Sequence, residues 1–222
     1  MDTKKIVIIV GGVLLLIALS IFVFYSPPEV DFDVDVEEEE EVDISEILAK
    51  SEELDSIYYD IMGGDVDEES WVGKFWQRGE KSRLEIITDE GIMISILNPE
   101  EDTALVYLPS YRVAMRMDSL QEREIREASV REKAAGILRY SPVVVGEENF
   151  NGKECIIIEY TDTEREEDVK MWVWEDYGIP VKMVMEADGD VSQIEVSNVD
   201  FNEIDEDIFV MPEEIEIMEL PE

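Results

Sequence analysis

An uninterrupted apolar stretch near the amino terminus constrains this chain more than any other feature of its sequence. Residues 6–25 (IVIIVGGVLLLIALSIFVFY) carry no charged side chain. As a helix, this stretch would be about 30 Å long, which matches the hydrocarbon core of a bilayer. We therefore predict that residues 1–26 form a short stub, containing Lys4 and Lys5, followed by a single transmembrane anchor.

The charges on the two sides of this stretch predict its orientation. Two lysines precede it, whereas Pro27, Pro28 and many acidic residues follow it. Because positively charged flanks stay on the cytoplasmic side, we expect a cytoplasmic amino terminus and an extracytoplasmic remainder. A cleaved signal peptide is the alternative, since Ala18 and Ser20 form a small-x-small pair. Both interpretations export the rest of the chain.

The segment that follows, residues 27–43, is strongly acidic and has no basic side chain. Mutual repulsion between its carboxylates favours an extended, flexible spacer. Asp31, Asp33 and Asp35 resemble the start of a calcium-binding loop, but valines occupy the sixth and twelfth positions, where such a loop needs Gly and Glu. We therefore predict a solvated spacer and no metal site.

The overall composition excludes several classes of function. The chain has 57 acidic and 18 basic residues and a net charge of −39, which is unsuited to binding a phosphate backbone, so no nucleic-acid partner is expected. It has no His and a single cysteine, Cys155, which excludes imidazole-based catalysis and an intrachain disulfide. The apolar fraction of 45% is nevertheless typical of a packed protein, and we expect residues 44–222 to fold.

Apolar spacing predicts the secondary structure of that domain. Ile44, Ile47, Leu48, Leu54, Tyr58, Ile61 and Met62 follow a helical period and predict one helix of about five turns, ended by Gly63 and Gly64. A second helix is predicted from Ser119 to about Gly136. Short extended runs between turn residues predict about ten strands. These runs are residues 71–78, 83–88, 91–98, 103–109, 111–117, 143–150, 155–161, 169–176, 179–186 and 191–201.

The order of these elements predicts the fold class. Short connections favour antiparallel meanders, and a sheet of about ten strands must curl. Its apolar face is too large to cover itself, so the two amphipathic helices must cover it. We therefore predict an α+β domain, a curved antiparallel β half-barrel whose concave face is covered by helices, preceded by an N-terminal transmembrane helix.

Several segments of the domain resemble a known family. Residues 73–117 run from an aromatic strand through an Arg-containing strand to further strands, and they are followed by GEENFNGKECIIIEY, MWVWEDYGIPVKMVME and VDFNEIDEDIFVMPE. In order and spacing these segments resemble the lipoprotein-carrier superfamily, whose LolA-type members have a similar series. The resemblance covers about residues 44–215. It implies an unclosed half-barrel with an apolar cavity for acyl chains, in which Arg83 helps to latch a helical lid. The tether departs from this pattern, because released carriers diffuse between membranes.

Methionine, aromatic and arginine side chains supply the candidate ligand-binding residues. Thioether and aromatic surfaces adapt to varied apolar partners, and a guanidinium can bind an anionic head. For most of them the alternative is core packing. For the arginines, an anionic headgroup site made from Arg83, Arg112 and Arg116 competes with simple compensation of the surrounding acid. The candidate residues are Phe75, Arg83, Met93, Met115, Met117, Trp172, Trp174, Met183 and Met185.

Together these features predict a non-enzymatic binding protein, tethered to the cell membrane by one span and facing outside the cytoplasm. Its expected ligand is a lipid, a lipoprotein acyl chain or another hydrophobic group. A membrane-protein partner is a further candidate, because a tethered domain cannot shuttle between membranes. No cofactor is expected. The alternative is a protein-interaction or sensory module on the same scaffold, with a cavity filled by its own side chains. A cavity of several hundred cubic ångströms, lined by helices and sheet, would distinguish the first function from the second.

Overall fold

The computed structural model describes residues 42–65, 71–88, 91–101, 103–117, 122–123, 125–126, 128–211 and 215–218. The predicted membrane span and most of the predicted spacer lie outside these residues. Within the part of the chain that is described, no helix is both long and apolar enough to cross a membrane.

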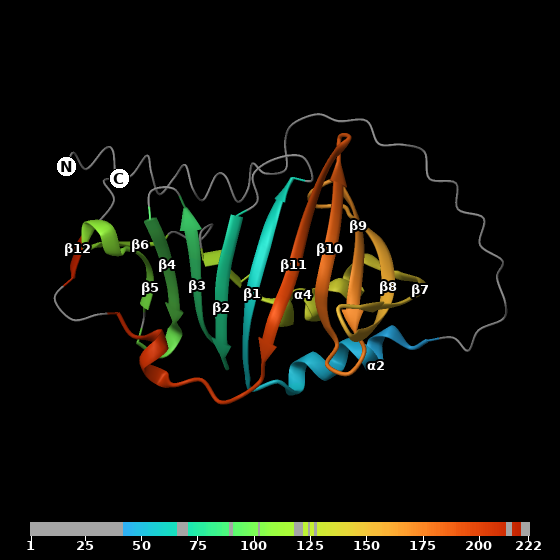
Figure 1. Ribbon diagram of the computed structural model, residues 1–222, viewed down its shortest axis with the longest axis horizontal. Helices are drawn as coiled ribbons and strands as arrows, with labels where there is room; N and C mark the ends of the chain where they lie inside the picture. The colour runs from blue at the N-terminus through green and yellow to red at the C-terminus, as the bar shows by residue number, and fades with distance from the viewer. Residues whose placement is uncertain are drawn as a thin grey trace.

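The described residues form one twelve-stranded sheet in the order β12-β6-β5-β4-β3-β2-β1-β11-β10-β9-β8-β7. Strands β1 to β6 form one antiparallel meander and β7 to β11 a second, and the two join where β1 pairs with β11 (Figure 1). β12 pairs in parallel with β6. The strands are β1 Ser56–Asp65, β2 Trp71–Arg78, β3 Lys81–Thr88, β4 Gly91–Asn98, β5 Thr103–Leu108, β6 Val113–Arg116, β7 Val143–Phe150, β8 Lys153–Asp162, β9 Glu167–Trp174, β10 Ile179–Ala187, β11 Asp190–Asp200 and β12 Glu216–Met218.

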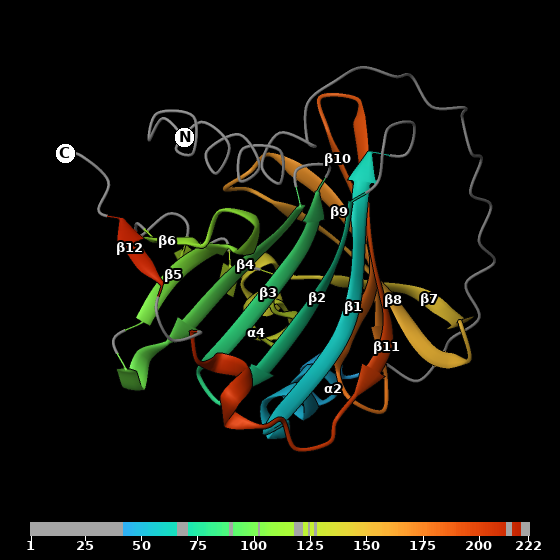
Figure 2. The ribbon, with the colours of Figure 1, turned by 60° about the vertical axis from the view of Figure 1, so that its left-hand side comes forward.

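The helices are few and short. Asp43 caps α2 (Ile44–Ala49) by accepting a hydrogen bond from the Ser45 amide, and α2 continues into the 3₁₀ turn η1 (Lys50–Glu53). The helix α4 (Val130–Ile137) lies in the hollow of the curved sheet (Figure 2). The remaining 3₁₀ turns are η2 Pro99–Glu101, η3 Pro109–Tyr111, η4 Leu138–Tyr140 and η5 Glu206–Phe209.

The first predicted helix is wrong over most of its length. Helical structure ends at Glu53, and β1 occupies the stretch that was expected to complete five turns. Ile57, Tyr59 and Ile61 alternate with more exposed side chains, so this segment fits a period of two as well as a helical one. Pairing with both β2 and β11 decides between the two, because it satisfies the backbone groups on both edges of β1.

The ten predicted strands are all present, close to their predicted bounds, and β1 and β12 add two that were not foreseen. The two-residue hairpin turns are also confirmed. Asn151 and Gly152 both have positive φ between β7 and β8, and so do Asp188 and Gly189 between β10 and β11. The second predicted helix is broken at Ser129, which caps α4 by accepting from the Glu132 amide.

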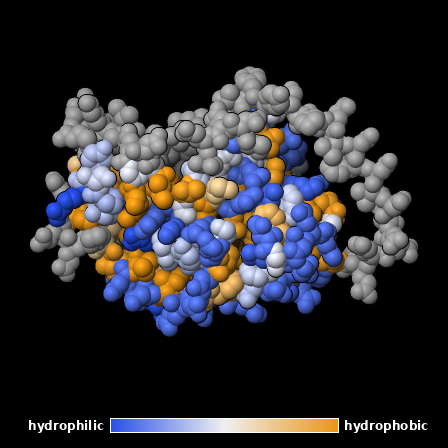
Figure 3. All heavy atoms as spheres, in the orientation of Figure 1, coloured by the Kyte–Doolittle hydropathy of each residue, from blue (hydrophilic) through white to orange (hydrophobic). Residues whose placement is uncertain are grey.

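The sheet has an inner face, which packs against α4, and an outer face, which Figure 1 views from the front. Because strand side chains alternate, the register assigns each residue to one face. Tyr59, Phe75 and Leu84 lie side by side on the inner face, while Tyr58, Trp76 and Arg83 alternate with them on the outer face. Apolar residues reach the surface among hydrophilic ones over the outer face (Figure 3). The fold is therefore a mainly β, curved, open sheet with α4 in its hollow.

Candidate functional site

The amino-terminal end of α4 is fastened to the inner face by buried polar groups. The fully buried Tyr59 hydroxyl donates to the Ala128 carbonyl at 2.8 Å and accepts from the Val130 amide at 3.2 Å. Ser129 donates to the Gln77 side-chain oxygen at 2.6 Å. Satisfied buried networks of this kind fix one position for the elements they join. The start of α4 is therefore held at a defined place over β1 and β2.

Arg131 adds a second attachment on the same helix. Its guanidinium donates to the Leu54 carbonyl at 3.0 Å and to the Gly79 carbonyl at 2.5 Å. Leu54 precedes β1, and Gly79 lies in the turn between β2 and β3. A planar guanidinium suits two carbonyls presented from different segments. The helix is thus tied to the foot of the first meander.

Beneath this attached end, the inner face of the first meander is filled by its own side chains. Phe75 is 0% exposed and stacks on Tyr59 with ring centroids 5.1 Å apart. Met93 and Met115 are each 2% exposed and belong to the same apolar cluster, which also contains Met117. Close packing leaves no room for a ligand among these four predicted residues in the conformation described.

Space opens instead beside α4, over the second meander. A pocket of about 430 Å³ lies between α4 and strands β8 to β10. Its apolar lining comes from Ile137 of α4, Val169 of β9, and Met183 and Met185 of β10. Met183 is buried and Met185 is partly exposed. Alternation places Met183 and Met185 on the same face of β10, so both thioethers lie on the pocket side.

The rim of this pocket is charged and richer in cations than the chain as a whole. It has five basic and four acidic side chains, whereas the full sequence has 18 basic and 57 acidic ones. Its basic side chains are Arg123, Arg126, Lys133, Arg139 and Arg165. Arg126 and Arg139 are exposed. An otherwise acidic protein therefore gathers positive charge at one concave place.

Two stacked tyrosines form one wall of the pocket. Tyr140 of η4 and Tyr160 of β8 have ring centroids 5.3 Å apart and an angle of 12° between their planes. Arg139 donates to the Tyr140 hydroxyl at 2.7 Å and lies over its ring. Burial is the main cause that raises the pKa of the Tyr160 hydroxyl, so this group stays neutral.

The nine predicted site residues are not gathered at one place. Two of them, Met183 and Met185, line the pocket. Three others lie on the outer face: Arg83, Trp172 and Trp174. Trp172 donates to Glu148 at 2.7 Å, and Trp174 packs edge-on against Tyr177. The remaining four are the inner-face core residues of the first meander.

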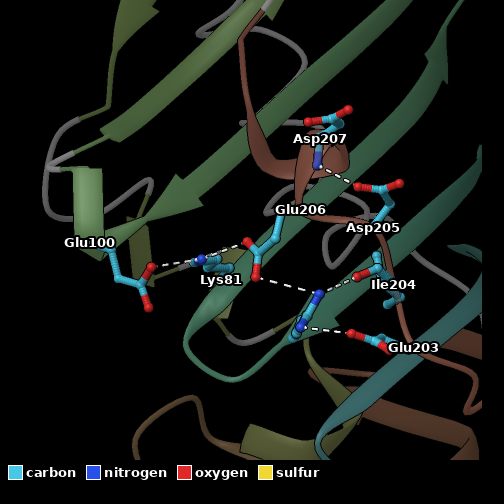
Figure 4. A network of polar contacts seen from close by, with 8 residues as sticks. Lys81, Glu100, Glu203, Ile204, Asp205, Glu206 and Asp207 are labelled. Atoms are coloured by element: carbon cyan, nitrogen blue, oxygen red, sulfur yellow. Dashed lines mark hydrogen bonds and ion pairs between the residues drawn. The ribbon is translucent and has the colours of Figure 1, made fainter.

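Arg83 holds the C-terminal segment, on the face opposite α4. Its guanidinium donates to the Ile208 carbonyl at 3.0 Å and pairs with Glu85. Arg78 and Lys81 bind the same segment through Glu203 and Glu206, as Figure 4 shows for Lys81. We call residues 201–211 the strap. The resemblance implied that Arg83 latches a helical lid, and its position on the outer face places it with the strap instead.

The other predicted arginine cluster is also dispersed. Arg116 is exposed on the outer face of β6, and Arg112 ends η3 in a left-handed conformation. The basic residues that do converge are Arg123 and Arg126, which precede α4, Lys133 within it, Arg139 after it, and Arg165. The sequence indicated only weakly that these side chains meet, because most of them lie in or next to the predicted helix from Ser119 to about Gly136, whose apolar stripe is weak.

A second pocket, of about 860 Å³, lies at the foot of the first meander beside the strap. Its lining is mostly charged, with six acidic side chains and the bases Arg78 and Lys81, which are engaged by the strap. Only Leu54, Pro99 and Phe201 give it apolar side chains. The smaller pocket differs from it in having apolar side chains from both helix and sheet and a more basic rim.

The sequence matches no protein-family model, and it matches no curated protein. Solved structures do share its fold. An uncharacterized conserved protein from Thermus thermophilus superposes with a TM-score of 0.58 at 12% identity, over 79% of this chain and 98% of the other. A chain of the Pseudomonas aeruginosa MucA/MucB complex superposes with a TM-score of 0.53 at 16% identity, over 80% of this chain.

This chain spans only 64% of the matched chain of the MucA/MucB complex. A looser similarity is found to a LolA superfamily protein from Nitrosomonas europaea, with a TM-score of 0.41 at 17% identity, over 77% of this chain and 99% of the other. At these identities the similarities to the Thermus thermophilus protein and to the chain of the MucA/MucB complex establish a shared fold and leave function to the site itself.

Proposed function

We propose that this chain is a membrane-tethered, extracytoplasmic binding protein that holds a lipid, a lipoprotein acyl chain or another hydrophobic group in the pocket beside α4. In this proposal residues 1–26 are the stub and anchor, residues 27–43 the spacer, and residues 44–222 the half-barrel domain. The observation that carries the proposal is a pocket of about 430 Å³ with an apolar floor from both helix and sheet. That volume falls within the range of sites that hold one small ligand.

The size of the pocket limits what can bind. About 430 Å³ suits one chain or one compact apolar group better than several acyl chains together. Met183 and Met185 provide a surface that can adapt to different apolar shapes. In this proposal the partly exposed Met185 contacts the ligand and the buried Met183 lies beside it on the same face of β10, whereas Phe75, Met93, Met115 and Met117 support the fold.

A labelling experiment on the full chain in nanodiscs tests this function. A palmitic acid analogue with a diazirine in its chain is photoactivated, and the labelled peptides are mapped by mass spectrometry. We expect labelling of the peptides that contain Ile137 and Met185. Labelling of residues 6–25 in the same sample tests the membrane anchor and serves as the internal reference.

A matched pair of variants assigns that labelling to the pocket. Met185→Trp fills the floor and should lower labelling of the pocket peptides severalfold. Met62→Trp introduces the same side chain at an exposed position on the outer face of β1 and should change nothing. Labelling confined to residues 6–25 in the unaltered protein would rule out the proposed function.

A protein-interaction or sensory module on the same scaffold is the second candidate. It is favoured by the filled inner face of the first meander, where Phe75 and Met115 leave no cavity. The fold is also that of a chain from a complex of two proteins, MucA and MucB. In vivo cross-linking that captures one membrane-protein partner, together with an empty pocket in the labelling experiment, would favour this second function.

A further inference from the structure

We propose that the pocket beside α4 selects an amphiphile with an anionic head, and that Arg126 and Arg139 at its mouth recognise the head. The inference rests on the proposed function, because it assigns a head group to a ligand whose apolar part occupies the floor. A site with a general affinity for apolar groups would bind charged and uncharged amphiphiles equally, whereas this site is proposed to prefer the anionic ones. The shared chemistry of such heads is a carboxylate or a phosphate oxygen.

The first observation is the concentration of cations at one concave place. Five of the 18 basic residues of the chain line this single pocket, together with four acidic ones. The local net charge is therefore +1, in a chain whose net charge is −39. Clefts focus the field of the charges that line them, so this lining repels an approaching anion less than the average surface of the chain does.

The second observation is the layering of the pocket. Ile137, Val169 and Met183 are buried at its apolar floor, whereas Arg126 and Arg139 are exposed at the rim. An amphiphile has the same division, with a chain that gains from burial and a head that must keep polar partners. Guanidinium groups fit this role because they bind carboxylate and phosphate oxygens through two parallel hydrogen bonds.

The third observation is that Arg139 is held in place by the wall. Its hydrogen bond to Tyr140, and the stacking of Tyr140 on Tyr160, fix the guanidinium at the edge of the pocket. Less side-chain freedom is then lost when an anion binds. Arg126 lies just before the turn that leads into α4, and its carbonyl accepts from the Ser129 amide at 3.0 Å. Both arginines are thus carried by backbone that is attached to the sheet.

The test compares two probes that differ only in head charge. The full chain in nanodiscs is labelled with the diazirine palmitic acid or with its methyl ester, and pocket labelling is normalised to that of residues 6–25. We expect the acid to label the pocket about three to ten times more than the ester, which is the range that one charge-assisted hydrogen bond supplies at an exposed site. Raising the salt concentration should reduce the difference.

Charge-reversal variants locate the effect. Arg126→Glu should remove most of the preference for the acid and leave ester labelling unchanged, and Arg139→Gln should reduce the preference. Arg116→Glu makes the same change of charge at an exposed position on the outer face and should have no effect. Circular dichroism confirms that each variant is folded, which is expected because all three side chains are exposed.

Competition separates a lipid head from a free anion. Dodecyl phosphate should displace the labelled acid, whereas inorganic phosphate at a hundredfold higher concentration should not. If inorganic phosphate competes equally well, the site binds free anions and the amphiphile proposal is wrong. Equal labelling by acid and ester, or equal loss in Arg116→Glu and Arg126→Glu, would also overturn it while leaving the proposed function intact. Failure of both probes to label the pocket would overturn the proposed function itself.

Discussion

In the first meander, Phe75, Met93 and Met115 are fully covered on the inner face, whereas in the second meander Met185 stays partly exposed on a pocket. Both halves use methionine at alternating strand positions, and both face α4. The difference lies in how the helix is placed. Its beginning is bonded to Tyr59 and Gln77 of the first meander, while its end passes over the second beside the pocket. The same residue type thus fills a core in one half and forms a binding floor in the other.

The outer face shows a parallel difference. Over the first meander the strap buries Ile96 and Phe209, which are both 0% exposed, and Arg83 and Lys81 hold it there. Over the second meander the outer face carries Trp172 and Trp174 with their own polar and aromatic partners. The strap therefore covers part of the outer face of the first half, where Met62, Val72, Ile87 and Ile92 stay exposed. We regard this half, filled on its inner face, as the support on which the pocket of the second half is built.

The largest expected difference between the halves is in the cost of removing a side chain. Phe75→Ala should lower the free energy of unfolding by about 3–5 kcal/mol, because it empties a closely packed site. Met185→Ala should cost only about 1 kcal/mol, because Met185 is partly exposed and already borders open space. Urea unfolding followed by tryptophan fluorescence measures both. Similar losses for the two variants would mean that the halves are equally packed.

The attachment of α4 is the next largest effect. Tyr59→Phe keeps the ring but leaves the Ala128 carbonyl and the Val130 amide without their buried partner, which should cost about 1–3 kcal/mol. Amide hydrogen exchange should then rise at the start of α4. Tyr58→Phe, at the neighbouring outer-face position where the hydroxyl donates to Asp60, should cost less than about 1 kcal/mol and leave α4 protected.

A smaller effect is expected from acidification of the strap. A hydrogen bond from Lys81 is the main cause that lowers the pKa of Glu206. In the folded state this pKa therefore lies below its ordinary value of 4.5. A depressed pKa stabilises the folded state above pH 4.5, and this contribution is lost as the pH falls through the folded value. Amide exchange at Ile204 and Ile208 should therefore increase near pH 3 relative to pH 6, after correction for intrinsic rates.

A variant provides the control for this pH dependence. In Lys81→Met the exchange of the strap amides should already be faster at pH 6, and it should change less on acidification. Protection of α4 should be the same in both proteins, because Lys81 lies on the outer face. If the strap in the unaltered protein is equally protected at both pH values, the ion pair between Lys81 and Glu206 does not hold it.

The two meanders could be predicted from the sequence because their signals are local. Residues 71–78, 91–98 and 143–150 match β2, β4 and β7 residue for residue. Two hairpins of the second meander have Asn-Gly and Asp-Gly turns, at residues 151–152 and 188–189, which favour a two-residue loop. Met183 and Met185 are two residues apart, which predicted that they share one face of one strand. Both residues line the pocket.

The segment from Ser56 to Asp65 shows where local signals fail. Its apolar residues fit two periods, and the partner that selects the strand, β11, lies more than a hundred residues away in the sequence. The rim of the pocket was missed for a related reason, because Arg126, Arg139 and Arg165 belong to different segments. The resemblance assigned Arg83 to a helical lid, whereas its guanidinium bonds to the strap. The local sequence of β3 does not reveal which element covers that face of the sheet.

The sequence by itself determined ten of the strands, two hairpin turns and the strongly acidic character, since each depends on neighbouring residues or on composition alone. Only the tertiary structure decided that β1 joins two meanders into one sheet, that the first half is filled, and that cations meet over the floor formed by Met183 and Met185. The physical reason is that packing and charge act between residues that are close in space, and long-range pairing of the strands sets which residues those are.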